Sequence, residues 1–216
     1  MALDFYHGHG SPYSWRVWLA LEHKKLAYNL KVLSFADKDT TKPEFVAINP
    51  RHTVPTIVDD GHAVWESLAI LEYLDERFAS APKLFPGDAK ERARVRRLIQ
   101  EMVSYLDREG MDPITDELFS KPAGVAPDME RVAKGRTALR TELEGLGKEL
   151  RGNFLAGDAP SAADFVLYPY LAYCWRIDFR KPEAGMADIL PAPMAALKKR
   201  IEQLAYFDKT FPPHWR

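Results

Sequence analysis

Cysteine is almost absent from this sequence, since Cys174 is the only one among 216 residues. A lone cysteine cannot form an intrachain disulfide, a Cys-x-x-Cys redox pair or a cysteine-rich zinc site. The first ten residues also lack the basic start and the continuous apolar run of a signal peptide, and no apolar stretch has the length of a membrane span. We therefore expect a cytoplasmic protein with no membrane as its partner.

Neither sign of charge is in excess, because 30 basic residues face 31 acidic ones and the formal net charge is -1. This balance gives no electrostatic reason to expect nucleic acid or an anionic membrane as the main partner. The basic run at 90–97 includes an acidic residue but no aromatic platform or glycine loop, so it is expected to be a solvated helix face rather than a phosphate site. The charge therefore leaves small molecules and other proteins as the expected classes of partner.

The first third of the chain alternates short apolar runs with helical patterns, which predicts an α/β unit. Ser11 followed by Pro12 is a favourable helix start, and Asp-Asp-Gly at 59–61 between two apolar runs is a hairpin signal. The predicted elements are a strand at 3–7, a helix at about 12–25, a strand at 28–33, a hairpin of 54–58 with 62–65, and a helix at about 66–78.

Strand patterns end at the connection around residues 79–87, which contains proline and glycine. Long helical patterns follow at about 88–120, 128–150, 161–180 and 193–204. We therefore predict an α/β domain at residues 1–80, followed by an all-helical domain at residues 88–216.

The helix start at Ser11 is the first candidate for chemistry. A hydroxyl there lies where backbone N–H groups and the helix dipole favour negative charge. A thiolate bound at this point would accept a hydrogen bond from Ser11, and the pKa of its thiol would fall. From spacing alone a plain N-cap is the simpler explanation, because Ser-Pro helix starts are common and need no ligand.

Two further segments offer contacts for a small zwitterionic peptide. Pro55 cannot donate to a sheet ladder, and a cis bond before it would turn the N–H and C=O of Val54 outward toward an extended peptide. At the next helix start, Ser67 and the first helical N–H groups could bind a carboxylate, while Glu66 could pair with an ammonium group. The alternatives are an edge proline that limits aggregation and ordinary helix capping.

In three segments the sequence resembles the cytosolic glutathione transferases, and it is most similar to the serine-type classes, zeta and its plant and bacterial relatives. The segments are Ser-Pro-Tyr-Ser-Trp-Arg-Val at 11–17, Asn-Pro-Arg-His-Thr-Val-Pro at 49–55 and Glu-Ser-Leu-Ala-Ile-Leu-Glu-Tyr-Leu at 66–74. A fourth, Phe-Leu-Ala-Gly-Asp-Ala-Pro-Ser-Ala-Ala-Asp at 154–164, is similar to the family's N-capping box. The resemblance therefore covers nearly the whole chain.

The resemblance implies a thioredoxin-like first domain that binds the cosubstrate glutathione, and a helical second domain that builds the pocket for a hydrophobic electrophile. It implies a detoxifying transferase without a metal, and a homodimer with the segments 66–78 and 88–120 at the interface. A glutathione-dependent isomerase or peroxidase, and a non-catalytic binding or ligandin module, are the alternatives.

Site residues follow from the same resemblance. Ser11 would be the catalytic residue, donating to the glutathione sulfur. The glutathione contacts would come from Lys42, Thr53, Val54, a cis-Pro55, Glu66 and Ser67. The electrophile contacts would come from Tyr13 and Tyr105.

The segment around Ser11 also departs from the zeta pattern. Tyr13 replaces the cysteine of the Ser-Ser-Cys motif in the isomerase branch, which argues against maleylacetoacetate isomerase activity. Tyr6 and His9 are further candidates to assist Ser11, since other branches of the family use a tyrosine. His7 and His9 lie two residues apart, but no third ligand is apparent nearby, so no metal site is expected.

Ser161 and Asp164 predict a capping box at the start of the helix at 161–180. In such a box the Asp164 carboxylate reaches back to the Ser161 N–H. We expect Asp164→Ala to cost about 1 kcal/mol or more of stability. Cys174, further along this helix, is expected to be a buried structural thiol.

Overall fold

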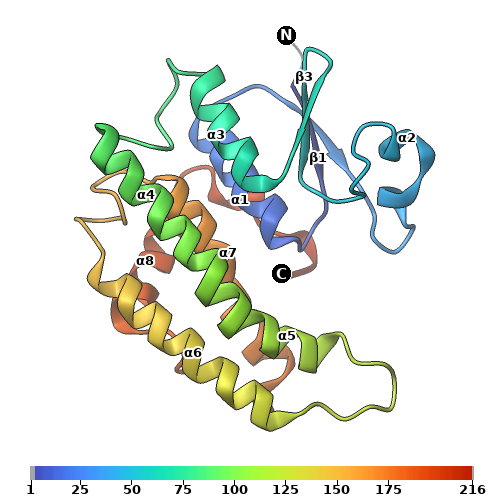
Figure 1. Cartoon of the computed structure of the whole chain (residues 1–216), viewed down its shortest axis with the longest axis vertical. Coiled ribbons are helices and arrows are strands. Elements are labelled where there is room, and N and C mark those ends of the chain that lie inside the picture. The colour runs from blue at the N-terminus through green and yellow to red at the C-terminus, as the bar shows by residue number, and fades with distance from the viewer. Residues whose placement is uncertain (1–2, 216) are drawn as a thin grey trace. The chain divides into compact units, whose positions relative to one another are not determined.

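The computed structural model describes residues 3–215, which divide into two compact units (Figure 1). The first unit contains the described residues up to Phe85 together with those from Leu204 onward, and the second runs from Pro86 to Gln203. The predicted division differs from this one at the end of the chain, where residues 204–215 group with the α/β unit instead of the helical one.

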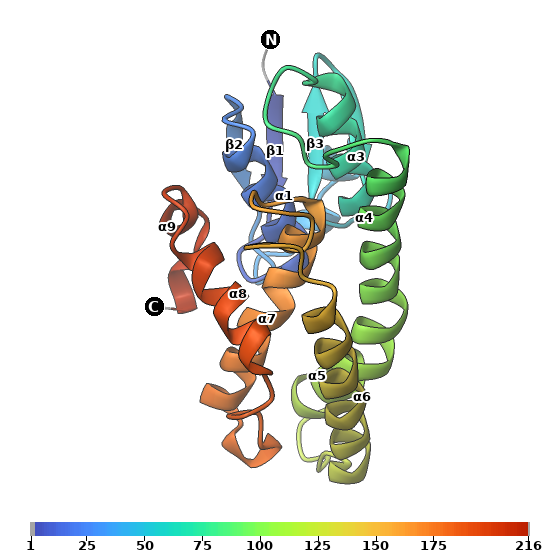
Figure 2. The same ribbon diagram turned by 90° about the vertical axis from the view of Figure 1, so that its left-hand side faces the viewer.

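The first unit is built on a four-stranded sheet of order β2-β1-β3-β4 (Figure 2). The strands are β1 (Leu3–His7), β2 (Asn29–Val32), β3 (Thr56–Asp59) and β4 (His62–Trp65). β1 is parallel to β2 and antiparallel to β3, which forms the hairpin with β4. The helices are α1 (Pro12–His23), α2 (Pro43–Val46) and α3 (Ser67–Arg77), with α1 packed against α3. The predicted thioredoxin-like α/β domain followed by helices is confirmed.

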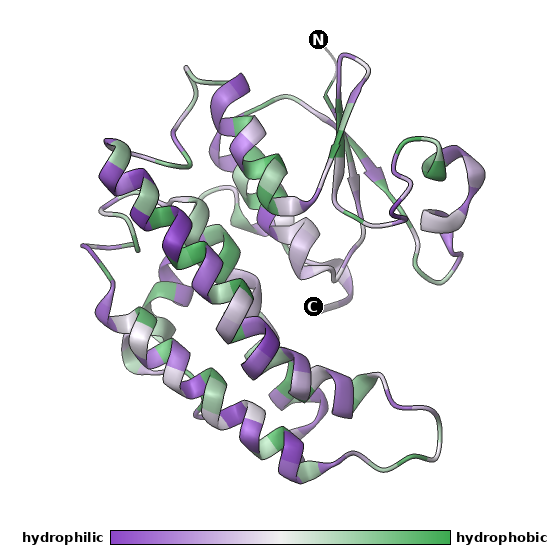
Figure 3. Cartoon of the chain, viewed as in Figure 1, coloured by the Kyte–Doolittle hydropathy of each residue, from purple (hydrophilic) through white to green (hydrophobic). Residues whose placement is uncertain are grey.

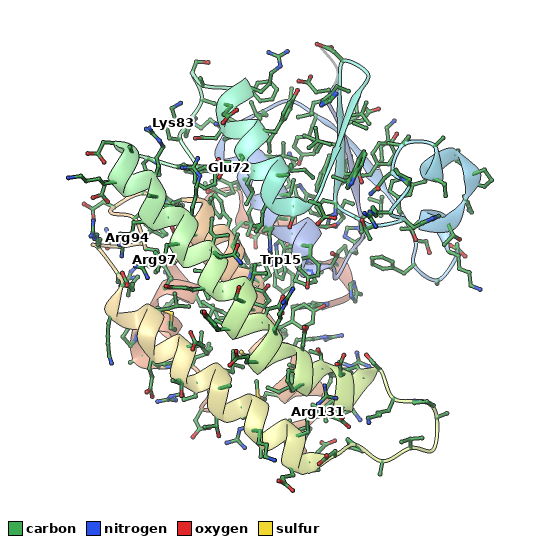
Figure 4. The ribbon with its side chains drawn as sticks, in the orientation of Figure 1. Trp15, Glu72, Lys83, Arg94, Arg97 and Arg131 are labelled. Atoms are coloured by element: carbon green, nitrogen blue, oxygen red, sulfur yellow. The ribbon has the colours of Figure 1, made fainter. Side chains whose placement is uncertain are left out.

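The segment at the end of the chain packs on α1. It contains the short helix α9 (Phe207–Thr210). The indole of Trp15 donates from Nε1 to the hydroxyl of Thr210 at 3.1 Å (Figure 4, where Trp15 is labelled). The ring of Trp215 packs edge-on against the ring of Trp15, with the two centroids 5.4 Å apart. Aromatic pairs of this kind stabilise beyond the area that they bury. These contacts explain why the last residues belong to the first unit.

The second unit is helical throughout its regular structure. Its elements are α4 (Ala89–Glu101), a π-helical segment (Met102–Met111), α5 (Asp112–Phe119), α6 (Met129–Lys148), α7 (Ala162–Arg180) and α8 (Ala192–Glu202). Within residues 3–215, no helix combines the length and the apolar character needed to cross a membrane.

The stretch predicted as one helix at 88–120 is three segments. Pro113 has no N–H to donate to the carbonyl one turn earlier, so regular hydrogen bonding is interrupted where the π-helical segment gives way to α5. Gly110 and Gly135 face each other where this segment crosses α6, since a Cβ on Gly135 would lie 2.9 Å from the carbonyl oxygen of Gly110. The two glycines permit a close crossing that helical periodicity does not predict.

Two arginines of the basic run in α4 are paired with acidic groups. Both Arg94 and Arg97 donate to the carboxylate of Glu149, each at 2.8 Å, and Arg97 also pairs with Glu101 (Figure 4). Polar and apolar residues alternate along α4 and α6, as expected for helices with one solvated face (Figure 3). The arginines therefore take part in ion pairs within the unit.

The predicted capping box is present at the start of α7. The carboxylate of Asp164 accepts from the Ser161 N–H at 2.8 Å, the Ser161 hydroxyl at 2.7 Å and the Leu155 N–H at 2.9 Å. Asp164 is 0% exposed. Cys174, further along the same helix, is buried as expected, and burial raises the pKa of its thiol to about 12. It is therefore a structural thiol rather than a reactive one.

We predict a pH-dependent contribution to stability from Glu117 of α5. Its buried carboxylate accepts from the Asp128 N–H at 2.9 Å and pairs with Arg131 and Lys121, which lowers its pKa to about 2. A lowered pKa stabilises the folded state above the unfolded pKa of about 4.3, and this contribution is lost as the pH falls toward 2.

The Tm of Glu117→Gln should therefore lie well below that of the wild type at pH 7, and the two values should converge as the pH approaches 2. Thermal unfolding followed by circular dichroism measures this difference. Glu130→Gln is the matched control, because Glu130 forms an exposed pair with Lys134. A gap between wild type and Glu117→Gln that stays constant with pH would contradict the prediction.

Candidate functional site

Three loops meet at one end of the sheet in the first unit. Tyr6, near the end of β1, pairs with Thr56, where β3 begins, and Thr56 pairs in turn with Trp65, where β4 ends. The loop after β1, the loop before β3 and the start of α3 therefore lie at neighbouring positions. They carry Ser11, Val54–Pro55 and Glu66–Ser67. The strand register thus brings the three sequence motifs to the same end of the sheet.

Ser11 is the N-cap of α1. Its Oγ accepts the Ser14 N–H at 3.2 Å, and its own N–H donates to the Gly8 carbonyl at 3.1 Å. No acceptor for the Ser11 O–H lies among residues 3–215, and the first turn of α1 contains no acidic residue. The hydroxyl is oriented as a cap while its proton is available to a ligand, at a helix N-terminus that no carboxylate neutralises.

The loop before β3 presents unpaired backbone groups. The Val54–Pro55 peptide bond is cis. The side chain of Val54 is buried, yet neither its N–H nor its C=O has a hydrogen-bond partner in the described part of the chain. Buried backbone groups are almost always paired, so the two groups at Val54 are available to an extended peptide.

The side chain of Asn49 holds this loop in place through hydrogen bonds. Its side chain is 0% exposed and donates from Nδ2 to the Thr53 carbonyl at 2.9 Å and to the Thr56 hydroxyl at 3.0 Å. Its Oδ1 accepts the Arg51 N–H at 2.9 Å. Asn49 lies within one of the sequence motifs, but no role was predicted for it. The structure shows that it determines the shape of the loop that presents Val54.

We predict that Asn49→Ala lowers the free energy of unfolding by about 2 kcal/mol, because buried partners are left without hydrogen bonds. It should also weaken glutathione binding, since the Val54 backbone is no longer held in position. Chemical denaturation and calorimetric titration measure the two effects. Arg51→Ala, which changes only an exposed side chain of the same loop, is the control and should leave stability within about 0.5 kcal/mol.

Glu66 and Ser67 form the start of α3. Glu66 has φ 69° and ψ 110°, a backbone conformation that non-glycine residues seldom adopt. Its carboxylate makes no capping bond, and no partner for it lies in the described chain. The hydroxyl of the buried Ser67 also lacks a partner among residues 3–215. Strained backbone of this kind concentrates at functional sites, so ordinary capping does not explain this pair.

Lys42 and Thr53 differ from the other predicted site residues because both side chains form hydrogen bonds within the protein. The Nζ of Lys42 lies 2.5 Å from Oδ1 of Asp39, and this hydrogen bond raises the pKa of Lys42. The Thr53 hydroxyl lies 3.3 Å from the Asn49 amide. Both side chains are at the surface. The structure therefore leaves them less bonding capacity for a ligand than Ser11, Val54, Glu66 or Ser67.

Aromatic side chains surround the loop that carries Ser11. Tyr13 is 42% exposed on the first turn of α1, with the Arg16 guanidinium carbon 4.9 Å from the centre of its ring. Phe35 lies on Gly8, where a Cβ would be 2.4 Å from Phe35 Cζ and 3.1 Å from Val54 Cγ2. Phe35 was not predicted, because a single apolar residue in a polar stretch has no periodic pattern.

Two histidines and Tyr6 lie beside this loop. Nε2 of His7 is 3.1 Å from Nδ1 of His9. Burial, with His9 as a smaller cause, lowers the pKa of His7 to about 3, and burial followed by His214 lowers the pKa of His9. Tyr6 packs on Phe45, and burial raises its pKa. These shifts favour the uncharged form of all three side chains.

The end of the chain also reaches this loop. A Cβ on Gly10, the residue before Ser11, would lie 3.1 Å from Nε2 of His214. Sequence patterns gave no signal for this contact between residues that are far apart in the chain. Residues 3–215 contain no group of three His, Cys, Asp or Glu side chains arranged to hold a metal ion.

Tyr105 belongs to the helical unit, whereas the other predicted site residues belong to the α/β unit. It is 47% exposed on the π-helical segment. That segment is fixed by a buried hydrogen bond of 2.8 Å from the Tyr170 hydroxyl to the Asp107 carboxylate. Irregular helical turns of this type occur frequently at functional sites.

Comparisons with known proteins agree with this geometry. Family models described as the N-terminal and C-terminal domains of glutathione S-transferase match residues 10–77 and 129–198, together more than half of the chain. A glutathione S-transferase from the Antarctic clam Laternula elliptica is 28% identical with a TM-score of 0.82, over 100% of this chain and 94% of the clam chain.

Two further solved structures are also similar. A glutathione S-transferase from Rhodospirillum rubrum F11 is 29% identical with a TM-score of 0.76, over 96% of this chain and 91% of its own. Glutathione transferase F7 from Populus trichocarpa is 25% identical with a TM-score of 0.78, over 96% of this chain and 97% of its own.

Proposed function

The chain belongs to the glutathione S-transferase family, and from this premise we propose that it is a serine-type enzyme that activates glutathione for attack on a hydrophobic electrophile. One observation carries the proposal. The Ser11 O–H, the Val54 backbone, the Glu66 carboxylate and the Ser67 hydroxyl lack partners within residues 3–215, while the side chains that support them are paired. Such unpaired polar groups at one end of the sheet are suited to binding a small peptide.

Glutathione would bind as an additional short strand. The Val54 N–H and C=O pair with the backbone of its cysteinyl residue. Its γ-glutamyl carboxylate accepts from the Ser67 hydroxyl and the first N–H groups of α3, and its ammonium group pairs with Glu66. Lys42 lies just before α2 and Thr53 lies between α2 and β3. Both are proposed to bind the glycine carboxylate, with Lys42 giving up its ion pair with Asp39 to do so.

Ser11 then supplies the chemistry. Its O–H donates to the sulfur, and the N-terminus of α1 adds a favourable field, so the thiol releases its proton to solvent near neutral pH. The thiolate attacks an electrophilic carbon, a carbon–sulfur bond forms, and the leaving group departs with its electron pair. Because the nucleophile belongs to the cosubstrate, no covalent enzyme intermediate is required.

The electrophile is proposed to be hydrophobic, since Tyr13 and Tyr105 are exposed aromatic side chains and Phe35 adds a third. A tyrosine at residue 13 favours a transferase over an isomerase with a zeta-type motif. We also propose a cytoplasmic homodimer that uses α3 and the stretch 88–120. Analytical ultracentrifugation tests the dimer, and a monomer at micromolar concentration would contradict it.

Glutathione should raise the Tm of the protein in a thermal-shift assay. At one hundred times its dissociation constant, a ligand that binds only the folded state adds about 2.7 kcal/mol. Glu66→Gln, which removes the charge that would pair with the ammonium group, should need a higher glutathione concentration for the same shift. The absence of any shift would contradict the proposal. A shift without conjugation of an aryl halide would favour the non-catalytic binding module.

A further inference from the structure

The helical unit contains a pocket that the proposed transferase reaction does not use. It has a volume of about 380 Å³ and lies between one face of α6 and the segment before α8. Its polar lining consists of Arg136, Arg140, Thr137, Thr141 and Asp188, and Ile189 adds an apolar surface. This volume is at the lower end of the range for small-molecule sites.

Arg136 is the unusual residue of the pocket. Its Nε is buried without a hydrogen-bond partner, and its guanidinium forms no ion pair with the described residues. Its guanidinium packs closely on the backbone of Gly185, where a Cβ would lie only 2.8 Å from its Nη1. Gly185 has a φ of +62°, a backbone conformation that favours glycine. A partly buried cation without a hydrogen-bond partner at its buried nitrogen is costly unless a ligand binds it.

Arg140, one turn further along α6, is satisfied by contrast. Its Nε donates to the Glu144 carboxylate at 2.6 Å, and its Nη1 donates to the Asp188 carbonyl at 2.8 Å. The carboxylate of Asp188 has no partner among residues 3–215, although it lines the same pocket as Arg136. The pocket therefore contains a cation, Arg136, and an anion, Asp188, that have no ionic partner among the described residues and do not pair with each other.

The two threonines provide only acceptors. The Thr137 hydroxyl donates to the Ala133 carbonyl at 3.1 Å, and the Thr141 hydroxyl donates to the Thr137 carbonyl at 3.0 Å. With its single proton committed, each hydroxyl offers a ligand only its lone pairs. A ligand that satisfies this lining needs an acidic group for Arg136, together with a donor group for Asp188 and the threonines.

We propose that this pocket is a second ligand site, for a small zwitterion of the amino-acid class. The ligand carboxylate binds Arg136, its ammonium group binds Asp188 and the threonine hydroxyls, and an apolar side chain contacts Ile189. A simple anion fits less well, because it would meet the Asp188 carboxylate without a donor. The site is separate from the residues proposed for glutathione, which belong to the other unit.

Isothermal titration calorimetry on the full-length protein tests this with three probes that share the isobutyl side chain of leucine. L-Leucine carries both charges, 4-methylpentanoate lacks the amine, and 3-methylbutylamine lacks the carboxylate. Leucine should bind saturably and at least about tenfold more tightly than either analogue, because each analogue loses one charge-assisted contact. Equal affinity for the three probes, or no saturable binding of leucine, would overturn the proposal.

Variants assign the binding to the pocket. Arg136→Gln and Asp188→Asn should each weaken leucine binding about tenfold, and Asp188 is exposed, so its replacement should leave the fold intact. Lys134→Gln removes a cation of α6 that pairs with Glu130, and it should have no effect. Ser67→Ala, at the proposed glutathione site, should also leave leucine binding unchanged. Loss of binding in Ser67→Ala but not in Arg136→Gln would refute the site while leaving the transferase proposal standing.

Discussion

Replacement of Ser11 with alanine should lower kcat/KM for the conjugation of glutathione to an aryl halide by a factor of about 100 to 1000, the range for removing one preorganised donor from a developing or stabilised anion. The Ser11 hydroxyl is oriented by the Ser14 N–H and has its proton available, so its loss removes a hydrogen bond to the sulfur. Glutathione affinity should be largely retained, because the proposed binding contacts come from Val54, Glu66 and Ser67. Steady-state kinetics with both substrates varied separates the two effects.

Ser11 also caps α1, so the kinetic loss has to be distinguished from a folding defect. Loss of a serine cap costs about 1 kcal/mol, which thermal unfolding would detect. Ser11→Asp preserves the cap but places a carboxylate beside the sulfur. It should be as stable as the wild type and at least as inactive as Ser11→Ala. Ser80→Ala, an exposed serine in the connection after α3, should change neither property. Wild-type turnover in Ser11→Ala would exclude Ser11 as the catalytic residue.

Replacement of Asp164 with alanine should be the most destabilising single change that we predict, at about 3 kcal/mol or more. The capping motif alone predicts about 1 kcal/mol. The structure raises this value because the fully buried carboxylate accepts from two backbone N–H groups and one hydroxyl, and each donor left without a partner costs about 1 kcal/mol or more. Chemical denaturation measures the change, and refolding should also be slower.

The controls for Asp164 use the same helix and the same side chain. Asp164→Asn is isosteric but turns an NH₂ group toward donors, so it should recover little of the loss. Asp178→Ala removes another aspartate of α7, one near the opposite end of the helix from the capping box, and should change stability by less than about 0.5 kcal/mol. Equal effects of Asp164→Ala and Asp178→Ala would show that the capping network does not stabilise the helical unit.

Local signals in the sequence were sufficient for most elements of the fold. The strand at 3–7, the helix start at Ser11–Pro12 and the hairpin around Gly61 depend on capping, turn geometry and periodicity, which act between near neighbours. The helix starts at Asp128 and Ser161 were found for the same reason. For the capping box, the hydrogen bond from the Ser161 N–H to Asp164 was predicted, whereas those from the Ser161 hydroxyl and the Leu155 N–H were not.

Features that depend on distant contacts were not predicted. The π-helical segment accompanies the close crossing of Gly110 and Gly135, and the terminal segment is placed by Trp15 and Thr210, 195 residues apart. Phe35 and Asn49 were missed at the candidate site for a similar reason. The position of Phe35 depends on the bare backbone of Gly8, and Asn49 acts through a loop whose shape is not apparent from the motif.

The central claim is that Ser11 and the N-terminus of α1 stabilise the thiolate of bound glutathione. The most direct test is a pH titration of the complex followed by the ultraviolet absorbance of the thiolate, for the wild type and Ser11→Ala. A free thiol has a pKa of about 8.5. The account predicts a value for bound glutathione at least about one unit lower in the wild type, because a hydrogen bond and the helix field favour the ionised form, and a return toward the free value in Ser11→Ala. An unshifted pKa in the wild type, or the same lowered pKa in both proteins, would contradict it.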